Sequence, residues 1–312
     1  MKNSQWVRYA RVVLIFLLPI ISAPGQSIRF AFEGDSLTLP FVRDSLRGIS
    51  GLEIVPATGE WHLVSDRGWH FTFTNLKTVR DLGDSTHLKR VKKTPFWFEA
   101  IRYHSQTGTY FWTDEHEFNT SLLTGKAVRD TASQLLLKMP LPGPNKGLEG
   151  IAITPLGVLW VAPEAGWEGQ TRLQQDTISF FRYADPLAAD STVERVAYPI
   201  DRCAFAQGDE RLGGISEILA IDETRLLVLE RCYDAAKKQL ITRLYAATLN
   251  EQTHTFTKEI AFDFNRQFPG TICNLEAMAW TDTTRQTLVL MADDNFKRSS
   301  TLRNQVIVLK RR

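Results

Sequence analysis

Acidic residues recur in pairs along this sequence, and carboxylates are side chains that perform acid–base chemistry or bind hard cations. Each pair begins with a glutamate beside small or apolar residues, and two short apolar runs separate it from the second acid. The leading glutamates lie 46, 50, 68 and 59 residues apart. The pairs are Glu53 with Asp66, Glu99 with Asp114, Glu149 with Glu164, Glu217 with Glu230, and Glu276 with Asp293.

The segment between the two acids of a pair has the pattern of a β-hairpin. After Glu149, residues 151–153 form one apolar run, residues 155–157 (Pro-Leu-Gly) form a turn, and residues 158–161 form a second run. A hairpin returns the chain to the end from which it started, so the two acids of a pair are expected to lie near one another. Repeats of this period are typical of propeller blades, and five copies arranged radially would gather ten acids at one end of the ring.

The fold class that these patterns predict is an all-β propeller of five blades, with six as an alternative. Residues 27–32 and 305–309 read as lone strands at the two ends of the repeats. We expect them to complete one blade together, because this closes the ring and removes open sheet edges. The runs predicted to form outer strands are residues 71–73, 135–137, 178–183, 193–198, 241–249 and 259–264.

The first 25 residues are predicted to be a signal peptide. Lys2, Arg8 and Arg11 precede an apolar run at residues 12–21, which is too short to span a membrane, and small residues follow it. An uncleaved anchor is the alternative interpretation. We therefore expect one domain over residues 26–312, secreted or periplasmic, monomeric and without a membrane span after cleavage.

Charge argues against a nucleic-acid partner. Residues 1–25 hold three of the 37 basic residues and none of the 35 acidic ones, which leaves 34 against 35 in the remainder. Nucleic-acid binding requires clustered basic charge, and no such excess is present.

The three cysteines, Cys203, Cys232 and Cys273, are an odd number. In an exported protein, one disulfide and one remaining thiol form the first of two equal alternatives, and Cys203 with Cys232 is the first pair to test. Three buried, reduced thiols are the alternative.

The gathered acids predict a divalent metal cofactor, with calcium favoured because it takes six to eight oxygen ligands. The alternative is that each acid accepts backbone N–H groups and holds neighbouring blades together. Arg67, Arg231, Lys146 and Lys297 lie close in sequence to the acids, which predicts a small anionic or phosphorylated substrate. Ordinary ion pairs with the adjacent acids are the alternative here. The run from Asp114 to Glu117 is also compact, but consecutive strand residues face opposite sides.

Several familiar catalytic motifs are missing from the sequence. It contains no G-x-S-x-G, H-E-x-x-H, Walker or G-x-G-x-x-G motif, no D-x-D-x-D-G calcium loop and no R-H-G signature. Ser50 and Ser216 occupy similar places in two repeats, but no histidine recurs beside them to act as a base. A serine esterase is thus the weakest of the hypotheses.

The repeated motifs resemble those of secreted proteins with a phytase-like domain, which are described as having esterase-like activity of phytase. They are G-I-S-G-L-E from Gly48, S-D-R-G from Ser65, G-L-E-G-I-A from Gly147, G-I-S-E-I-L-A from Gly214, L-L-V-L-E-R from Leu226, N-L-E-A-M-A-W from Asn274 and A-D-D-N-F from Ala292. The resemblance implies a β-propeller that hydrolyses phosphate esters with the help of bridging metal ions.

The first functional hypothesis is therefore an exported, metal-dependent phosphoesterase. In this interpretation the catalytic carboxylates are Glu149, Glu217 and Glu276, and the phosphate contacts are Arg67, Arg231 and Lys297. The metal ligands are Glu53, Asp66, Glu99, Glu164, Glu230, Asp293 and Asp294. The second hypothesis is a non-catalytic secreted propeller that binds a ligand or a protein, with its acids structural or holding calcium.

Overall fold

A computed structural model describes residues 27–38, 46–128, 133–141, 146–166, 177–188, 192–201, 214–234, 238–296 and 304–312. The predicted signal peptide, Cys203 and Lys297 lie outside these residues, so their predictions stay untested. No helix in the described part of the chain is long and apolar enough to cross a membrane.

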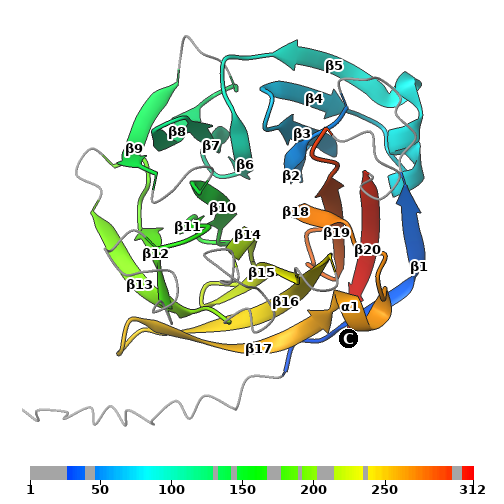
Figure 1. Ribbon diagram of the computed structural model, residues 1–312. Helices are drawn as coiled ribbons and strands as arrows, with labels where there is room; N and C mark the ends of the chain where they lie inside the picture. Colours follow the sequence, from blue (N-terminus) through cyan, green and yellow to red (C-terminus); the bar gives the residue numbers. More distant parts are fainter. Residues whose placement is uncertain are drawn as a thin grey trace, which may run out of the picture.

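The described strands form antiparallel sheets arranged radially around one axis, which confirms the predicted β-propeller (Figure 1). Three sheets have four strands, and an eight-stranded sheet consists of two further groups of four that meet at a single parallel bridge, Ala197 with Thr255. The innermost strands are β2 (Ile49–Val55), β6 (Phe98–His104), β10 (Leu148–Ile153), β14 (Gly214–Ala220) and β18 (Asn274–Trp280). Each innermost strand contacts the next around the ring, and β18 contacts β2.

The remaining strands lie progressively farther from the axis (Figure 1). The second strands are β3 (Glu60–Ser65), β7 (Thr109–His116), β11 (Leu159–Pro163), β15 (Arg225–Asp234) and β19 (Thr287–Asp293). The third strands are β4 (Trp69–Phe73), β8 (Asn119–Gly125), β12 (Thr177–Tyr183), β16 (Gln239–Asn250) and β20 (Gln305–Arg311). The outermost are β5 (Leu88–Lys93), β9 (Gln134–Pro140), β13 (Val193–Pro199), β17 (Thr255–Asp263) and β1 (Phe30–Thr38).

Within the ranges given above, helical structure is limited to short segments between strands. Two 3₁₀ turns, η1 (Val79–Gly83) and η2 (Ser85–His87), precede β5, and a single α-helical turn, α1 (Phe264–Gln267), follows β17. Thr78 caps η1 with a capping box that includes Asp81.

The two ends of the chain complete one sheet, as the sequence predicted. Strand β1 pairs with β20 in antiparallel register from Phe30 opposite Arg311 to Thr38 opposite Gln305, with one irregularity between Phe32 and Ser36. The other edge of β20 pairs with β19. The closing sheet therefore joins chain segments from opposite ends of the sequence, and this pairing removes two open edges.

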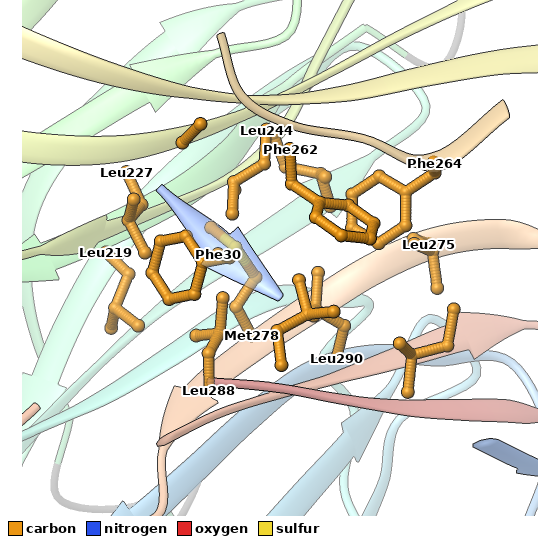
Figure 2. Packing of buried hydrophobic residues seen from close by; sticks show 14 of the residues in the cluster. Phe30, Leu219, Leu227, Leu244, Phe262, Phe264, Leu275, Met278, Leu288 and Leu290 are labelled. Carbon is orange, nitrogen blue, oxygen red and sulfur yellow. The ribbon is translucent and has the colours of Figure 1, made fainter. Parts of the chain in front are cut away.

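Apolar side chains fill the spaces between neighbouring sheets. Figure 2 shows the cluster between the β14–β17 group and the sheet of β18, β19, β20 and β1, where Leu227, Leu244 and Phe264 meet Met278 and Leu290. All seven residues of β14 are buried, because an innermost strand is covered on both faces by the adjacent sheets. A strand of this kind positions its side chains rigidly, which suits a site near the axis.

The two cysteines that the structure describes are in different chemical states. Cys232 is disulfide-bonded, and Cys203, the partner that the sequence favours, lies outside the described residues. Cys273 is a thiol, 5% exposed, and belongs to the same apolar cluster as Leu275 and Met278.

Candidate functional site

Every innermost strand contains a β-bulge near its first residues, where it pairs with the second strand. The registers shift between Ile49 and Gly51, between Phe98 and Ile101, between Leu148 and Gly150, between Ile215 and Glu217, and between Leu275 and Ala277. A bulge leaves one residue outside the ladder and redirects its side chain, and such bulges are common next to active sites. The extra residues here are Ser50, Glu99, Glu149, Ser216 and Glu276.

A second equivalent position follows directly from the register. The backbone N–H of Glu164 donates to Gly147 O, just before β10, at 2.9 Å, and those of Asp66 and Glu115 donate to Gly48 O and Trp97 O in the same way. In the other two sheets Arg231 lies opposite Gly214 and Asp293 lies opposite Asn274. This position is therefore occupied by four acids and one arginine.

Seven acids from these two positions interact with one another at one end of the innermost strands. The charges of Glu149, Glu276, Glu115 and Asp66 act on Glu99, and those of Glu164, Glu115 and Glu276 act on Glu149. The charges of Glu276 and Asp66 act on Asp293. We call this set the acidic cluster: Asp66, Glu99, Glu115, Glu149, Glu164, Glu276 and Asp293.

Burial and mutual repulsion disfavour full ionisation of the acidic cluster. Burial, and then Glu149 and Glu276, raise the pKa of Glu99 well above its ordinary value. Burial raises the pKa of Asp66 to about 6 and, together with Glu164, that of Glu115 to about 7. The pKa values of Glu149 and Asp293 are raised for the same two reasons. A bound cation would relieve this repulsion.

Two buried or half-buried cations offset part of the charge. Arg231 donates to Glu276 Oε1 and, at 2.6 Å, to Asn274 Oδ1, and its Nη2 lies 3.6 Å from Glu164 Oε1. Lys146 pairs with the same Glu164 oxygen. Arg231, a predicted phosphate contact, thus already pairs with the protein's own acids.

Three buried carboxylate oxygens in the acidic cluster have no hydrogen-bond partner among the described residues. They are Asp66 Oδ1, Glu115 Oε2 and Glu164 Oε2. The side chains of Glu115 and Glu164 are 5% and 3% exposed. Leaving such a buried atom without a partner is costly. Within the described ranges, no three His, Cys, Asp or Glu side chains are arranged to hold a metal ion as they stand.

Asp294 and Arg67 lie beside the acidic cluster with different surroundings. Asp294 is fully buried and accepts hydrogen bonds from Arg47 Nε at 2.6 Å, Gly48 N at 3.0 Å and Phe296 N at 3.1 Å. These three hydrogen bonds give Asp294 a structural role, because those from Arg47 and Gly48 hold the chain before β2 against the end of β19. Arg67 is exposed, 3.8 Å from Asp66, and its guanidinium lies over the Phe296 ring. It remains accessible to an anion.

The structure does not bring Glu53, Glu217 and Glu230 into the acidic cluster. Ser50 and Ser216 occupy the bulges of β2 and β14, whereas Glu53 and Glu217 lie farther along those strands. Glu230 faces Lys258 and Tyr198, to which it is hydrogen-bonded. The alternation of strand side chains sends Glu230 and its neighbour Arg231 to opposite faces. The expected gathering of all ten acids was therefore wrong for these three.

Glu53 and Glu217 instead surround Arg102 on the axis side of the ring. Arg102 is 2% exposed and donates to Leu52 O at 2.8 Å and Ile218 O at 3.0 Å, and its Nη2 lies 2.9 Å from Glu217 Oε2. Beyond them the last residues of the innermost strands line a cavity of about 360 Å³ that includes Glu53, Arg102, Trp280 and Arg285. The charges at this second end are balanced by arginine.

Asp114 was also paired wrongly, and Glu115 is the member of the acidic cluster that sequence reasoning missed. Asp114 accepts from Trp97 N at 2.7 Å and lies 3.0 Å from His116. Glu115 takes the second equivalent position, because its backbone N–H donates to Trp97 O, two residues before the bulge residue Glu99. It follows Glu99 by 16 residues, between the 15 of Glu149 and Glu164 and the 17 of Glu276 and Asp293, so spacing alone does not distinguish it from Asp114.

The bulge serines are not arranged as nucleophiles. Ser50 Oγ donates to Phe98 O at 2.5 Å, and Ser216 Oγ donates to Leu275 O at 3.1 Å. Each hydroxyl thus joins one innermost strand to the next, and no described histidine is hydrogen-bonded to either. This geometry argues against a serine–histidine mechanism.

Comparisons with known proteins agree with this architecture. A family model described as "Phytase-like: Esterase-like activity of phytase" matches residues 44–296. A search of curated proteins found no match.

Among solved structures, endo-arabinase from Bacteroides thetaiotaomicron VPI-5482 is 14% identical with a TM-score of 0.50, covering 88% of this chain and 97% of that chain. A luciferin-regenerating enzyme is 12% identical with a TM-score of 0.49, covering 85% and 92%. At such identities the likeness concerns the fold alone. Because the family model spans most of the sequence, including all seven acids of the cluster, this chain belongs to the phytase-like family.

Proposed function

We propose that this protein is an exported hydrolase of phosphate esters that works with a divalent metal ion, calcium being favoured, at the acidic cluster. The observation that carries the proposal is the set of three buried carboxylate oxygens without partners inside a group of seven acids. Family membership supports hydrolysis of an ester. The proposal that the protein is exported rests only on the sequence of residues 1–25.

The donor set fits a hard cation. Asp66, Glu99, Glu115, Glu164 and Asp293 supply only oxygen ligands, and these are the ligands that calcium takes. The described arrangement needs side-chain rotations to bring three of them to one point. Such a metal ion, when bound, would polarise a phosphoryl oxygen and lower the pKa of a bound water.

The chain's own residues would position the substrate and accept the proton. Glu149 and Glu276 project from the bulges of β10 and β18, which lie on either side of β14 in the ring, and Arg231 restrains Glu276. Burial and the charge of Glu164 raise the pKa of Glu149, and a carboxylate with a raised pKa is, in its ionised form, a stronger base toward an attacking water. Arg67 is the exposed arginine beside the cluster, and its guanidinium can make bidentate contacts with a phosphate group.

The first test is metal-dependent phosphate release. The chain lacking residues 1–25 is incubated with phytate or p-nitrophenyl phosphate in calcium, and then in chelator. Release that requires the metal is the expected result. Calcium that raises the melting temperature without any release would favour the second hypothesis, a non-catalytic propeller with a structural ion.

The sharpest variant is Glu149→Gln, and Glu53→Gln is its matched control. Both changes remove one charge from an innermost strand, but Glu53 lies with Arg102 at the other end of the ring. We expect Glu149→Gln to lower kcat/KM by about 100-fold or more, a typical loss for an acid–base group, and Glu53→Gln to leave it within a few-fold. Equal calcium binding and equal turnover in Glu149→Gln and wild type would remove the acidic cluster from the proposed site.

A further inference from the structure

A second, chemically different hollow lies between the β2–β5 sheet and the β6–β9 sheet. Its volume is about 220 Å³, and its lining includes His62, His70, Arg90, Lys92 and Tyr110. Strand register places these groups together: His62 lies opposite Thr72, His70 opposite Lys92, and Thr72 opposite Arg90. Alternation along the strands then directs His62, His70, Thr72, Arg90 and Lys92 to the same face of the β2–β5 sheet, whereas Tyr110 comes from β7 of the neighbouring sheet.

The polarity of this face is unusual for the space between two propeller sheets. The opposite face of β3 and β4 packs Leu63, Phe71 and Phe73 into an apolar cluster with Val289 and Met291. Farther along the same strands, toward the acidic cluster, the space between the two sheets is also apolar, with Val64 of β3 and Trp112 of β7 in one cluster. The polar residues therefore occupy only one part of this space, where a cavity replaces packed core.

The buried histidines form a hydrogen-bonded chain with one donor left over. His62 Nδ1 lies 2.9 Å from His70 Nε2, and Tyr110 Oη lies 3.2 Å from His62 Nε2. Burial lowers the pKa of His62 to about 4 and that of His70 to about 3, so both rings are neutral at pH 7. Three neutral groups then carry three protons for two internal bonds. Whichever tautomers are present, one N–H or O–H of this trio is left over and can donate to a group outside the trio.

The charges around the hollow are almost all positive. Lys89, Arg90, Lys92 and Lys126 contribute to the lining, and Glu60 is its one acid. Glu60 is already paired with Lys89 at 2.5 Å. Among the described residues, neither Arg90 nor Lys92 has an acid within salt-bridge distance. The hollow thus offers hydrogen-bond donors and positive charge but no free carboxylate.

We infer that this hollow binds a small oxyanion, such as inorganic phosphate, sulfate or the phosphate group of a monoester. Arg90 and Lys92 supply the charge, and the leftover donor of the Tyr110–His62–His70 chain supplies a neutral contact. Guanidinium and ammonium groups with neutral N–H or O–H donors are the partners that tetrahedral oxyanions take in proteins. The site is separate from the acidic cluster and does not depend on the proposed hydrolysis.

Titration calorimetry with inorganic phosphate tests the inference, and chelator is present throughout so that no metal at the acidic cluster contributes. We expect wild type to bind phosphate and Arg90→Ala/Lys92→Ala to bind at least tenfold more weakly. The control is Arg266→Ala/Lys310→Ala, which removes the same two charges from residues outside the hollow. It should bind as wild type does.

A second variant tests the buried donors. His70→Phe removes the ring nitrogens, and we expect it to weaken binding severalfold in a chain that still shows a β-rich circular dichroism spectrum. Glycerol phosphate, used in place of phosphate, distinguishes a free ion from an ester, and binding of either supports the inference. Absence of phosphate and sulfate binding at millimolar concentration in wild type, or equal affinity of Arg90→Ala/Lys92→Ala and its control, would overturn it.

Discussion

The hydroxyl of Ser50 on β2 forms a hydrogen bond with the neighbouring innermost strand, β6. It is 1% exposed, and its Oγ donates to Phe98 O, the residue just before the β6 bulge. Ser216 makes the equivalent bond to Leu275 O before the β18 bulge. The five bulge residues therefore have two different roles. The two serines join neighbouring strands, and the three glutamates form part of the acidic cluster.

Replacing Ser50 with alanine should destabilise the protein without changing its chemistry. Loss of a buried hydrogen bond leaves the Phe98 carbonyl without that donor, and we expect the free energy of unfolding to fall by about 1 to 2 kcal/mol. Denaturant titration of Ser50→Ala and Ser216→Ala measures this loss. Phosphate release should stay within a few-fold of wild type. A loss of all turnover in a folded Ser50→Ala protein would instead revive the serine esterase hypothesis.

Glu217 contributes a pH dependence that can be isolated with one substitution. It is fully buried, and burial raises its pKa to about 8 although Arg102 lowers it. Since this folded-state value exceeds the ordinary one of 4.5, the folded protein holds a proton that the unfolded chain has released between the two. Unfolding therefore becomes easier as pH rises through this window.

Glu217→Gln should remove that dependence, because glutamine resembles the protonated acid. Between about pH 5 and pH 8 we expect the free energy of unfolding of wild type to fall by roughly 2 to 4 kcal/mol relative to the variant, at 1.4 kcal/mol per pKa unit. Denaturant titrations at several pH values, all in chelator, provide the measurement. Parallel curves for the two proteins would show that Glu217 has an ordinary pKa.

At the scale of elements, the bulges and the glycines before them set the position of the carboxylates. Gly48, Gly147 and Gly214 each precede or begin an innermost strand and lie directly against an acid of the cluster. A Cβ at Gly147 would stand 2.2 Å from Glu115 Oε2 and 2.9 Å from Thr120 Oγ1. The neighbouring sheet leaves no room for a side chain there.

Gly147→Ala should therefore displace Glu115 and disturb metal binding. We expect a destabilisation of about 1 to 3 kcal/mol from overpacking, together with calcium affinity weakened at least tenfold. Gly59→Ala is the control, since nothing lies within 4 Å of its Cβ position, and its φ of +66° makes it costly by about 1 kcal/mol only. Calorimetry should show unchanged calcium binding in that control. Unchanged binding in both variants would separate Glu115 from any metal site.

At the scale of the whole molecule, the ring is held closed by one strand. Strand β20 supplies the partner of β1 on one side and of β19 on the other, and the backbone N–H of Arg312 donates to Arg29 O. Its residues Val306, Ile307 and Leu309 are completely buried between sheets. The last strand thus completes both the hydrogen bonding and the core of its sheet.

Removing residues 305–312 should abolish the cooperative fold, because β1 and β19 would both gain open edges and the cluster of Figure 2 would lose Ile307 and Leu309. A milder change, Ile307→Ala, should lower the free energy of unfolding by about 2 to 5 kcal/mol. Thermal unfolding followed by circular dichroism checks both. A truncated chain that melts as sharply as wild type would mean that the closing strand is dispensable.

The sequence by itself determined the propeller, the closure of the ring by its two ends and the positions of six outer strands, but it missed β5 and β8. Runs of alternating apolar residues and turn residues are local signals, and a repeat of the same pattern shows that the units are equivalent. These patterns identify a strand even when its predicted ends are wrong by one or two residues. The same reasoning located Glu99, Glu149, Glu276, Asp66, Glu164 and Asp293 as residues that lie together.

Only the tertiary structure decided which acid of each repeat reaches the acidic cluster. A bulge adds one residue to a strand, and in a strand a shift of one residue exchanges the two faces. Glu53 and Glu217 were thus chosen where Ser50 and Ser216 hold the equivalent position, and Glu230 and Asp114 were chosen where Arg231 and Glu115 hold it. The repeat fixes the neighbourhood of a residue within the ring, but the direction of its side chain depends on hydrogen bonds between strands that no local pattern specifies.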